Sequence, residues 1–159
     1  MAKIFAGRHT ARIEGSFVVF LIGMRINRLF AVSKWLPVAR AMPGMLEELK
    51  KNPESGFLGA GIVMNWRGVM TVQYWRSFEH LHAYAHARDA LHLPAWRAFN
   101  RAVGGDGSVG IWHETYVVQP GNSESIYVNM PSVGLAQASQ LEPIGASTDN
   151  ARARIDREK

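Results

Sequence analysis

Residues 56–75, GFLGAGIVMNWRGVMTVQYW, decide how this chain folds. Two runs rich in apolar, β-branched and aromatic residues, 56–66 and 68–75, meet at Arg67-Gly68. Such runs are typical of two strands joined by a short turn, so we expect an antiparallel hairpin. The remaining elements must be arranged around it.

Strand-like runs also stand well before and after this hairpin. The run SFVVFLIGMRI at 16–26 is almost wholly apolar and predicts a buried strand. The run SVGIWHETYVVQ at 108–119 alternates in character and predicts a further strand.

Helical patterns connect these strands. Residues 27–51 have helical periodicity, with a break or kink expected near Pro43, because proline removes a backbone donor and clashes with the preceding turn. Ser77 suits the N-cap of a second helix that runs to about residue 88. A third helical piece is expected over 93–103, with its proline in the first turn.

The resulting order, β-α-β-β-α-β, is that of the ferredoxin-like split unit, an α+β fold with an antiparallel sheet and its helices on one face. The strands at 16–26 and 56–66 are apolar nearly throughout, so both faces of the sheet require burial. The helices of one chain shield only one face. We therefore predict a homodimer, a dimeric α+β barrel, whose sheets pack together and enclose a cavity.

The length of 159 residues, with 47% hydrophobic and 19% charged, indicates one globular domain with extensions. We expect an N-terminal arm or edge strand over 1–15 and the ferredoxin-like domain over 16–136. Residues 137–159 are weakly patterned and increasingly polar, and we expect a flexible C-terminal tail there.

Composition excludes several classes of function. The chain has no cysteine, which excludes disulfides, thiolate-bound zinc and thiol nucleophiles. Its net charge of +5 is scattered rather than gathered in a run, so we expect no nucleic-acid partner. The longest apolar run, 17–24, is too short to span a bilayer and lacks the order of a signal peptide. We expect no membrane partner and a cytoplasmic location.

Two blocks carry a family resemblance: YWRSFEHLHAYAHARDALHLPAW at 74–96 and WHETYVV at 112–118. They resemble the dimeric α+β-barrel superfamily, which includes antibiotic-biosynthesis-type monooxygenases, haem-degrading monooxygenases and aldoxime dehydratases. Over about 17–136 the chain looks most like a monooxygenase-like domain family of unknown function (DUF4188).

The resemblance implies an oxygenase or haem-dependent enzyme that acts on a hydrophobic small molecule. A non-catalytic module that binds such a molecule, or haem, with the same fold is the alternative, because one fold hosts many functions. The cofactor stays open between haem and none.

The strand at 108–119 supplies the first catalytic candidates. Alternation puts His113 and Glu114 on opposite faces, and one of them should line a cavity on the open face of the sheet. A cavity histidine can act as general acid or base near neutral pH, whereas a histidine at the dimer interface would only be hydrogen-bonded. Arg76 can bind a carboxylate or a haem propionate bidentately, or form a surface ion pair with Glu79.

The segment around residues 75–96 supplies the cofactor-binding candidates. In the haem-degrading relatives a histidine on or just after this helix ligates iron, and the resemblance gives that role to His92. Trp75 and Trp96 can form apolar walls for a flat ligand. Alternatively, His92 caps the following helix and the two tryptophans belong to the core.

Three further polar side chains, Glu79, His82 and His86, share one face of the expected helix, while His80 lies on another side. A carboxylate and two imidazoles can bind a divalent metal. Their spacing is not a recognised metal motif, so we expect a solvated helix face and no metal site.

Overall fold

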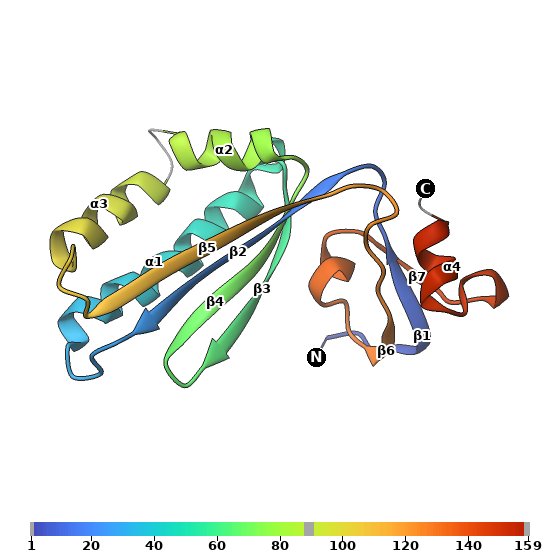
Figure 1. The fold of residues 1–159 in the computed structure, drawn as a ribbon, viewed down its shortest axis with the longest axis horizontal. Coiled ribbons are helices and arrows are strands. Elements are labelled where there is room, and N and C mark those ends of the chain that lie inside the picture. Colours follow the sequence, from blue (N-terminus) through green and yellow to red (C-terminus); the bar gives the residue numbers. More distant parts are fainter. Residues whose placement is uncertain (1, 88–90, 158–159) are drawn as a thin grey trace.

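The computed structural model of the protein describes residues 2–87 and 91–157 (Figure 1). In chain order its strands and helices are β1 Phe5–Arg12, β2 Phe17–Ile26, α1 Val32–Lys51, β3 Phe57–Asn65, β4 Gly68–Trp75, α2 Phe78–His86, α3 His92–Ala102, β5 Val109–Val118, β6 Tyr127–Met130, β7 Gln140–Pro143 and α4 Ala151–Asp156. Short 3-10 turns lie at η1 Pro53–Ser55, η2 Gly134–Gln137 and η3 Ala146–Thr148.

The larger sheet has four antiparallel strands in the order β3-β4-β2-β5. Strand β2 is central, and its Leu21 pairs with Val72 of β4 and with Glu114 of β5. This arrangement confirms the ferredoxin-like fold expected from the sequence. Within the described residues the sheet stays open, with β3 and β5 at its edges, and no closed barrel forms.

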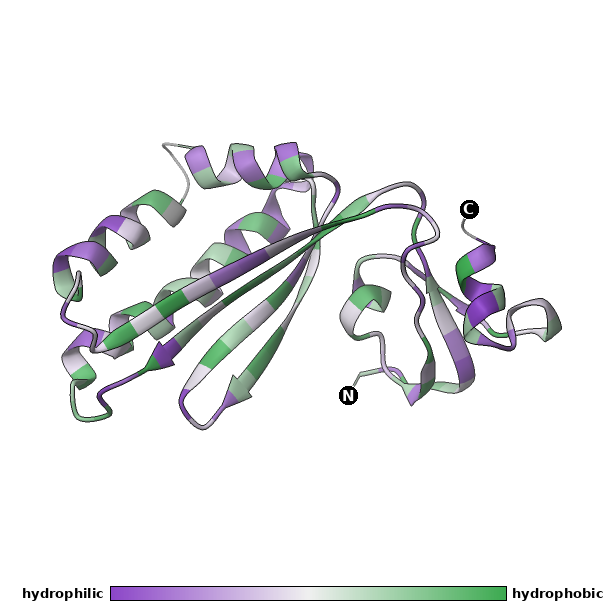
Figure 2. Ribbon diagram, viewed as in Figure 1, coloured by the Kyte–Doolittle hydropathy of each residue, from purple (hydrophilic) through white to green (hydrophobic). Residues whose placement is uncertain are grey.

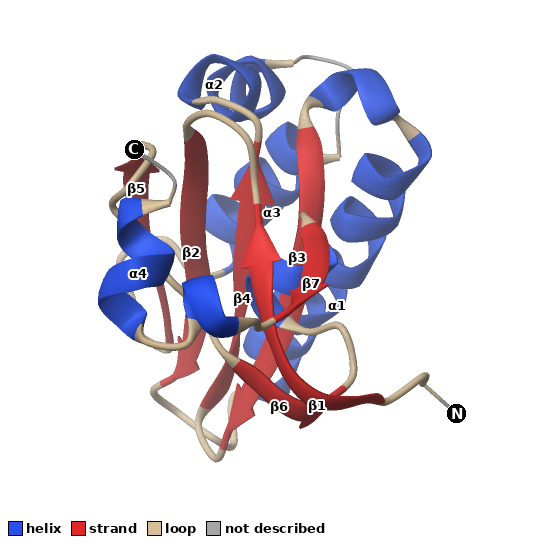
Figure 3. Ribbon diagram, turned by 90° about the vertical axis from the view of Figure 1, so that its right-hand side faces the viewer, coloured by secondary structure: helices blue, strands red, loops and turns tan. Residues whose placement is uncertain are grey.

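Helices α1, α2 and α3 lie on one face of this sheet (Figures 1 and 3). Two hydrophobic clusters join them to it. The cluster near α2 contains Val18, Leu49, Trp75 and Leu81, and the cluster at the opposite end contains Met24, Val103 and Val109. Between the two clusters the helices and the sheet do not close on each other, as described below.

Helix α1 is one continuous helix, so of the break or kink expected near Pro43 the break does not occur. Pro37 and Pro43 both lie inside it, with exposed rings. A proline costs about 3 kcal/mol in a helix interior. Leu46 and Leu49 are 4% and 3% exposed, and burial of each leucine contributes about 1.5–3 kcal/mol. Packing of the apolar face thus offsets much of the cost of the two prolines.

The stretch expected to form an arm and the stretch expected to form a tail come together in a second sheet. Its strand order is β6-β1-β7, so β1 is central, and the 3-10 turn η3 and helix α4 follow β7. Residues 137–157 therefore contain regular structure where the sequence led us to expect a flexible tail. Ion pairs and hydrogen bonds give this order, and a hydropathy pattern cannot reveal them.

Arg154 of α4 illustrates this. It is 7% exposed, and its guanidinium pairs with Glu124 at 2.8 Å and donates to the carbonyl oxygen of Thr148 at 3.0 Å. A buried guanidinium is stable only when such partners surround it. One arginine thereby ties α4 to the residues before β6 and to η3.

The smaller sheet contacts the larger one through η2, which lies against β3. Gly134 has a positive φ of 59° and stands beside the hydroxyls of Tyr74 and Tyr127. Elsewhere the second face of the large sheet remains exposed, with Val63 at 47%, Trp112 at 39% and Tyr116 at 51%. Figure 2 shows how hydrophobic residues follow one another along β3.

No helix in the part of the chain that the structure describes has the length and apolarity needed to cross a membrane.

Candidate functional site

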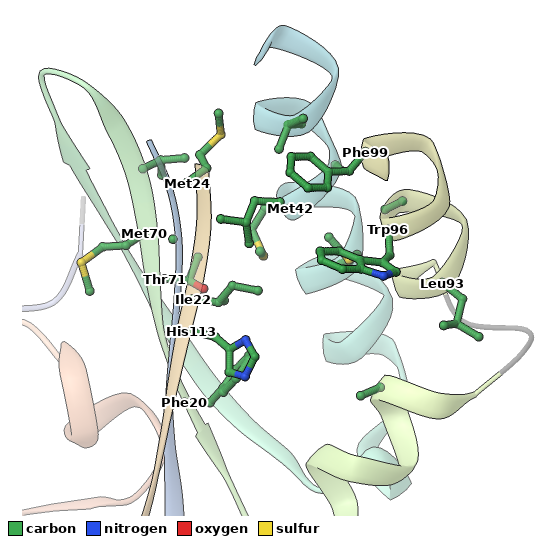
Figure 4. A pocket seen from close by; sticks show the side chains of 18 of the residues that line it. Phe20, Ile22, Met24, Met42, Met70, Thr71, Leu93, Trp96, Phe99 and His113 are labelled. Carbon is green, nitrogen blue, oxygen red and sulfur yellow. The ribbon is translucent and has the colours of Figure 1, made fainter. Parts of the chain in front are cut away.

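A cavity of about 620 Å³ lies between the large sheet and helices α1, α2 and α3 (Figure 4). Its lining is mostly apolar, and the polar side chains in it are Lys34, Thr71, His82, His86, His113 and Thr115. The volume is within the range of small-molecule sites, which are concave, apolar and carry a few polar groups.

Strand alternation builds the sheet side of the cavity. Successive side chains of a strand point to opposite faces, so every second residue of β2 and β5 faces the helices. From β2 these are Phe20, Ile22 and Met24, and from β5 they are Ile111, His113 and Thr115. This cavity lies under the chain's own helices, whereas the cavity expected on the open face, between two paired sheets, stays a prediction.

Aromatic and sulfur-containing side chains build the helix side. Trp96 and Phe99 of α3 are stacked, with ring centroids 5.5 Å apart, and both line the cavity. Met42 and Met45 of α1 line it as well, three residues apart on one face of the helix. Figure 4 shows Met42 and Trp96 facing His113 across the space. Methionine is flexible, so this wall can adapt to ligands of different shape.

His113 is the imidazole on the sheet side of the cavity, where the other polar side chains are the hydroxyls of Thr71 and Thr115 (Figure 4). Its ring stands 5.6 Å from that of Phe20, measured between centroids. Within the described residues neither ring nitrogen has a hydrogen-bond partner. The imidazole is thus available to a ligand in the cavity.

Glu114 lies on the opposite face of the sheet, as alternation requires. Its carboxylate accepts a hydrogen bond of 2.6 Å from the hydroxyl of Tyr116, and this bond raises the pKa of Tyr116. Of the two neighbouring candidates, the structure places His113 in the cavity and Glu114 outside it.

The other predicted residues do not gather in one site. Trp96 lines the cavity, but Trp75 is 0% exposed and its indole donates to Gln73 at 3.0 Å in the core. Arg76 is exposed beside the start of α2, away from the cavity lining. The backbone of His92 begins α3, and its side chain lies outside what the structure describes.

The histidines of α2 have two separate roles. The Ser77 hydroxyl accepts from the backbone amide of His80 at 3.4 Å and pairs with its Nδ1 at 2.9 Å, which confirms Ser77 as the N-cap. His82 and His86 line the cavity rim, with their rings stacked at 4.1 Å. Among the described residues no three histidine, aspartate or glutamate side chains are placed to hold a metal ion.

At the end of the cavity near the start of α1, Lys34 forms an ion pair with Asp106. The bond from Lys34, and a second from the backbone amide of Ser108 at 2.7 Å, hold the pKa of the Asp106 carboxyl far below its usual range. The charge of Lys34 is therefore matched by a neighbour.

Haem, which the sequence resemblance raised as a cofactor, would need an iron ligand and cations for its propionates. The cavity offers imidazoles, but its one described cation, Lys34, already pairs with Asp106. The described lining therefore fits a neutral, hydrophobic ligand better than a dianionic macrocycle.

Several lining residues were not expected from the sequence. Met42, Met45 and Phe99 were not singled out in the sequence, because a helix face that lines a cavity has the same periodicity as one that packs in a core. His82 and His86 were expected on a solvated face, and the structure puts them at the rim. The one signal in the sequence was the three-residue spacing of Met42 and Met45, which puts both on one face of a helix.

The chain's similarity to known protein families shows which family it belongs to. A family model described as monooxygenase af470-like matches residues 17–135, which is most of the chain. The chain belongs to the monooxygenase af470-like family. One relative, monooxygenase af470 of Aspergillus fumigatus, is 31% identical over 152 residues, covering 81% of this chain and 53% of the relative. The chain thus spans about half the length of this curated relative. Membership confirms the monooxygenase-like resemblance found in the sequence.

The fold of this chain is similar to that of an aldoxime dehydratase of known structure. Aldoxime dehydratase OxdRE, crystallised in complex with butyraldoxime, superposes with a TM-score of 0.70 at 17% identity, over 87% of this chain and 43% of that chain. SnoaB, a cofactor-independent oxygenase from Streptomyces nogalater, has a TM-score of 0.47 at 10% identity, over 65% and 94% of the two chains. At such low identity the first likeness shows the fold alone.

Proposed function

We propose that this chain is a monooxygenase-like oxidoreductase that holds a hydrophobic small molecule in the cavity, with His113 as the acid–base group. One observation carries the proposal: an imidazole with no hydrogen-bond partner in the described structure faces a mostly apolar cavity. Family membership supports oxygenation as the reaction class.

In this proposal the cavity residues prepare the substrate and dioxygen oxidises it. His113 removes a proton from an acidic C–H or O–H group of an electron-rich substrate, which makes the substrate easier to oxidise. One oxygen atom of O₂ enters the substrate and the other leaves as water, with the substrate itself losing the two hydrogens. Trp96 and Phe99 hold the substrate's apolar body over the sheet.

We further propose that the chain works as a homodimer joined through the open face of the large sheet. Trp112, Tyr116 and Val63 are exposed on or beside that face, and the chain's own smaller sheet contacts it mainly through η2. An exposed apolar sheet face of this kind marks an interaction surface. In this arrangement the partner covers the open face, while each cavity stays within its own chain.

The second candidate function is a binding module that uses the same cavity without turnover. The apolar lining favours it, because His113 is the one titratable side chain described on the sheet side. Under this alternative a hydrophobic ligand raises the melting temperature by binding the native state, but no oxygen is consumed.

Variants of His113 separate the two functions. With electron-rich phenols or quinols as probes, we expect wild-type protein to consume oxygen, and His113→Gln to lose at least about 100-fold in rate, as removal of a general base does. The variant should keep its thermal stabilisation by the probe. His82→Gln, at the cavity rim, is the matched control and should keep most of the rate.

Two results would count against the oxygenase. Stabilisation by the probes with no oxygen consumption in wild-type protein would favour the binding module. A saturable absorption change on hemin titration, lost in a variant of a cavity histidine, would instead favour a haem-binding protein.

A further inference from the structure

We propose that one end of the molecule docks on an anionic lipid bilayer. We call this end the loop end. It consists of the β2–α1 loop (residues 27–31), the β3–β4 turn with the strand residues that flank it (64–68) and the α3–β5 loop (103–108). Figure 1 shows the three loops gathered at the end of the large sheet that lies away from the smaller sheet.

Hydrogen bonds tie the three loops into one surface. The amide of Ile26 donates to the carbonyl oxygen of Arg67 at 2.7 Å, which joins the β2–α1 loop to the β3–β4 turn. The amides of Asn27 and Arg28 donate to the carbonyl oxygen of Ser108 at 3.0 and 3.1 Å, which joins the third loop. The loop end therefore presents its side chains together rather than on independent loops.

The loop end carries the largest exposed apolar groups of the described chain. Phe30 is 101% exposed, Met64 82% and Trp66 79%, whereas the other exposed large hydrophobic residues described do not exceed 56%. Isolated exposed apolar residues are ordinary, but a group of them with aromatic rings marks a binding surface. Tryptophan in particular favours the interface between lipid and water.

The charged side chains at the loop end indicate which partner fits it. Arg28 and Arg67 of the loop end, and Arg25 just before it in β2, have no carboxylate partner among the described residues. Asp106, the one acidic residue in the loop end, already pairs with Lys34. An apolar tip beside arginines that have no carboxylate partner complements a bilayer, in which acyl chains lie beneath anionic headgroups.

Arg67 also holds Trp66 in place. Its guanidinium lies 4.3 Å from the centre of the indole ring and donates to the carbonyl oxygens of Ile26 and Asn27 at 3.4 and 3.3 Å. The ring and the charge are thereby presented side by side, with little freedom left to lose on docking.

Docking here would bring lipid-dissolved molecules to the cavity. Three residues that line the cavity lie next to the loop end: Met24 near the end of β2, Lys34 in the first turn of α1 and Ala102 at the end of α3. The expectation of no membrane partner rested on the lack of a spanning segment, whereas docking concerns surface contact. It can be measured without turnover, so it stands apart from the oxygenase proposal.

Vesicle cosedimentation tests this. We expect the full chain to bind phosphatidylcholine vesicles that contain phosphatidylserine, with weaker binding at high salt. The double variant Phe30→Ser/Trp66→Ser should lower the partition coefficient at least about tenfold, because it removes the buried apolar area. Arg28→Gln should lower it about fivefold. Ile126→Ser and Lys51→Gln, away from the loop end, are the matched controls and should bind like wild type.

Three outcomes would overturn the proposal. The first is no binding that depends on phosphatidylserine, and the second is equal binding by the wild type and by folded variants of the loop end. The third is a wild-type oligomer that the double variant dissociates without changing vesicle binding, which would make the loop end a contact between copies. Circular dichroism checks folding, and Arg28→Gln carries the test if the double variant does not fold.

Discussion

At the scale of single residues, the alternation of side chains along β5 decides which of them can reach a ligand in the cavity. The sequence predicted that His113 and Glu114 would face opposite ways, and they do. It could not tell which residue faces the helices, because neither set of alternate residues in β5 is uniformly apolar. The pairing of His113 with Ile22 of β2, whose side chain also lines the cavity, decides this.

A glycine at the β3–β4 turn gives a first prediction at this scale. A Cβ on Gly68 would overlap the carbonyl oxygen of Met24 in the neighbouring strand, whereas one on Gly61 would meet nothing within 4 Å. Gly68→Ala should therefore lower the free energy of unfolding by about 1–3 kcal/mol, as overpacking does. Gly61→Ala is the matched control. Equal denaturant midpoints for the two variants would contradict the strand pairing described.

The hydroxyl of Tyr84 gives a second prediction. Burial raises its pKa, and so does its hydrogen bond of 2.9 Å to the carboxylate of Glu48. The folded state holds this proton more tightly than the unfolded state, in which tyrosine loses it near pH ~10. The resulting stability is fully present below that pH and is lost as pH rises further. In unfolding titrations across this range, Tyr84→Phe should lose less stability than wild type, and parallel curves would argue against it.

At the scale of elements, signals within a short stretch of sequence predicted the features that depend on that stretch alone. The N-cap at Ser77 and the strands at 17–26, 57–65, 68–75 and 109–118 follow from side-chain type and spacing. The helix over 27–51 was also expected, but neither its continuity past Pro43 nor the order of residues 137–157 followed from these signals. Tertiary packing of Leu46 and Leu49 keeps the helix continuous past Pro43, and non-local polar contacts order the C-terminal residues.

Arg154 tests how those C-terminal residues are held. Arg154→Met removes its ion pair with Glu124 and its hydrogen bond to Thr148, and should destabilise the smaller sheet by about 1.5–3 kcal/mol, as loss of a charge-assisted hydrogen bond does. Faster amide hydrogen exchange over β7 and α4 is the measurement. Arg152→Met is the matched control, since its exposed pair with Asp156 is worth about 0–1 kcal/mol. Equal exchange in the two variants would contradict the account.

At the scale of the whole molecule, the sequence predicted the architecture but not the position of the cavity. Two apolar sheet faces indicated a need for cover on both sides, and from this we expected the cavity between two sheets. How far helices stand from a sheet depends here on the side chains of three strands and three helices at once, so no single segment reveals a cavity between them. The open face keeps its apolar character, which supports the proposed homodimer.

The position of the ligand site is the central claim, and two indoles report on it from opposite faces of the sheet. Trp96 lines the cavity, and Trp112 lies on the open face. In a titration with a hydrophobic phenol followed by ¹H–¹⁵N NMR, we predict saturable shifts of the Trp96 indole and the His113 imidazole, with the Trp112 indole unchanged. Saturable shifts confined to Trp112 would contradict the account.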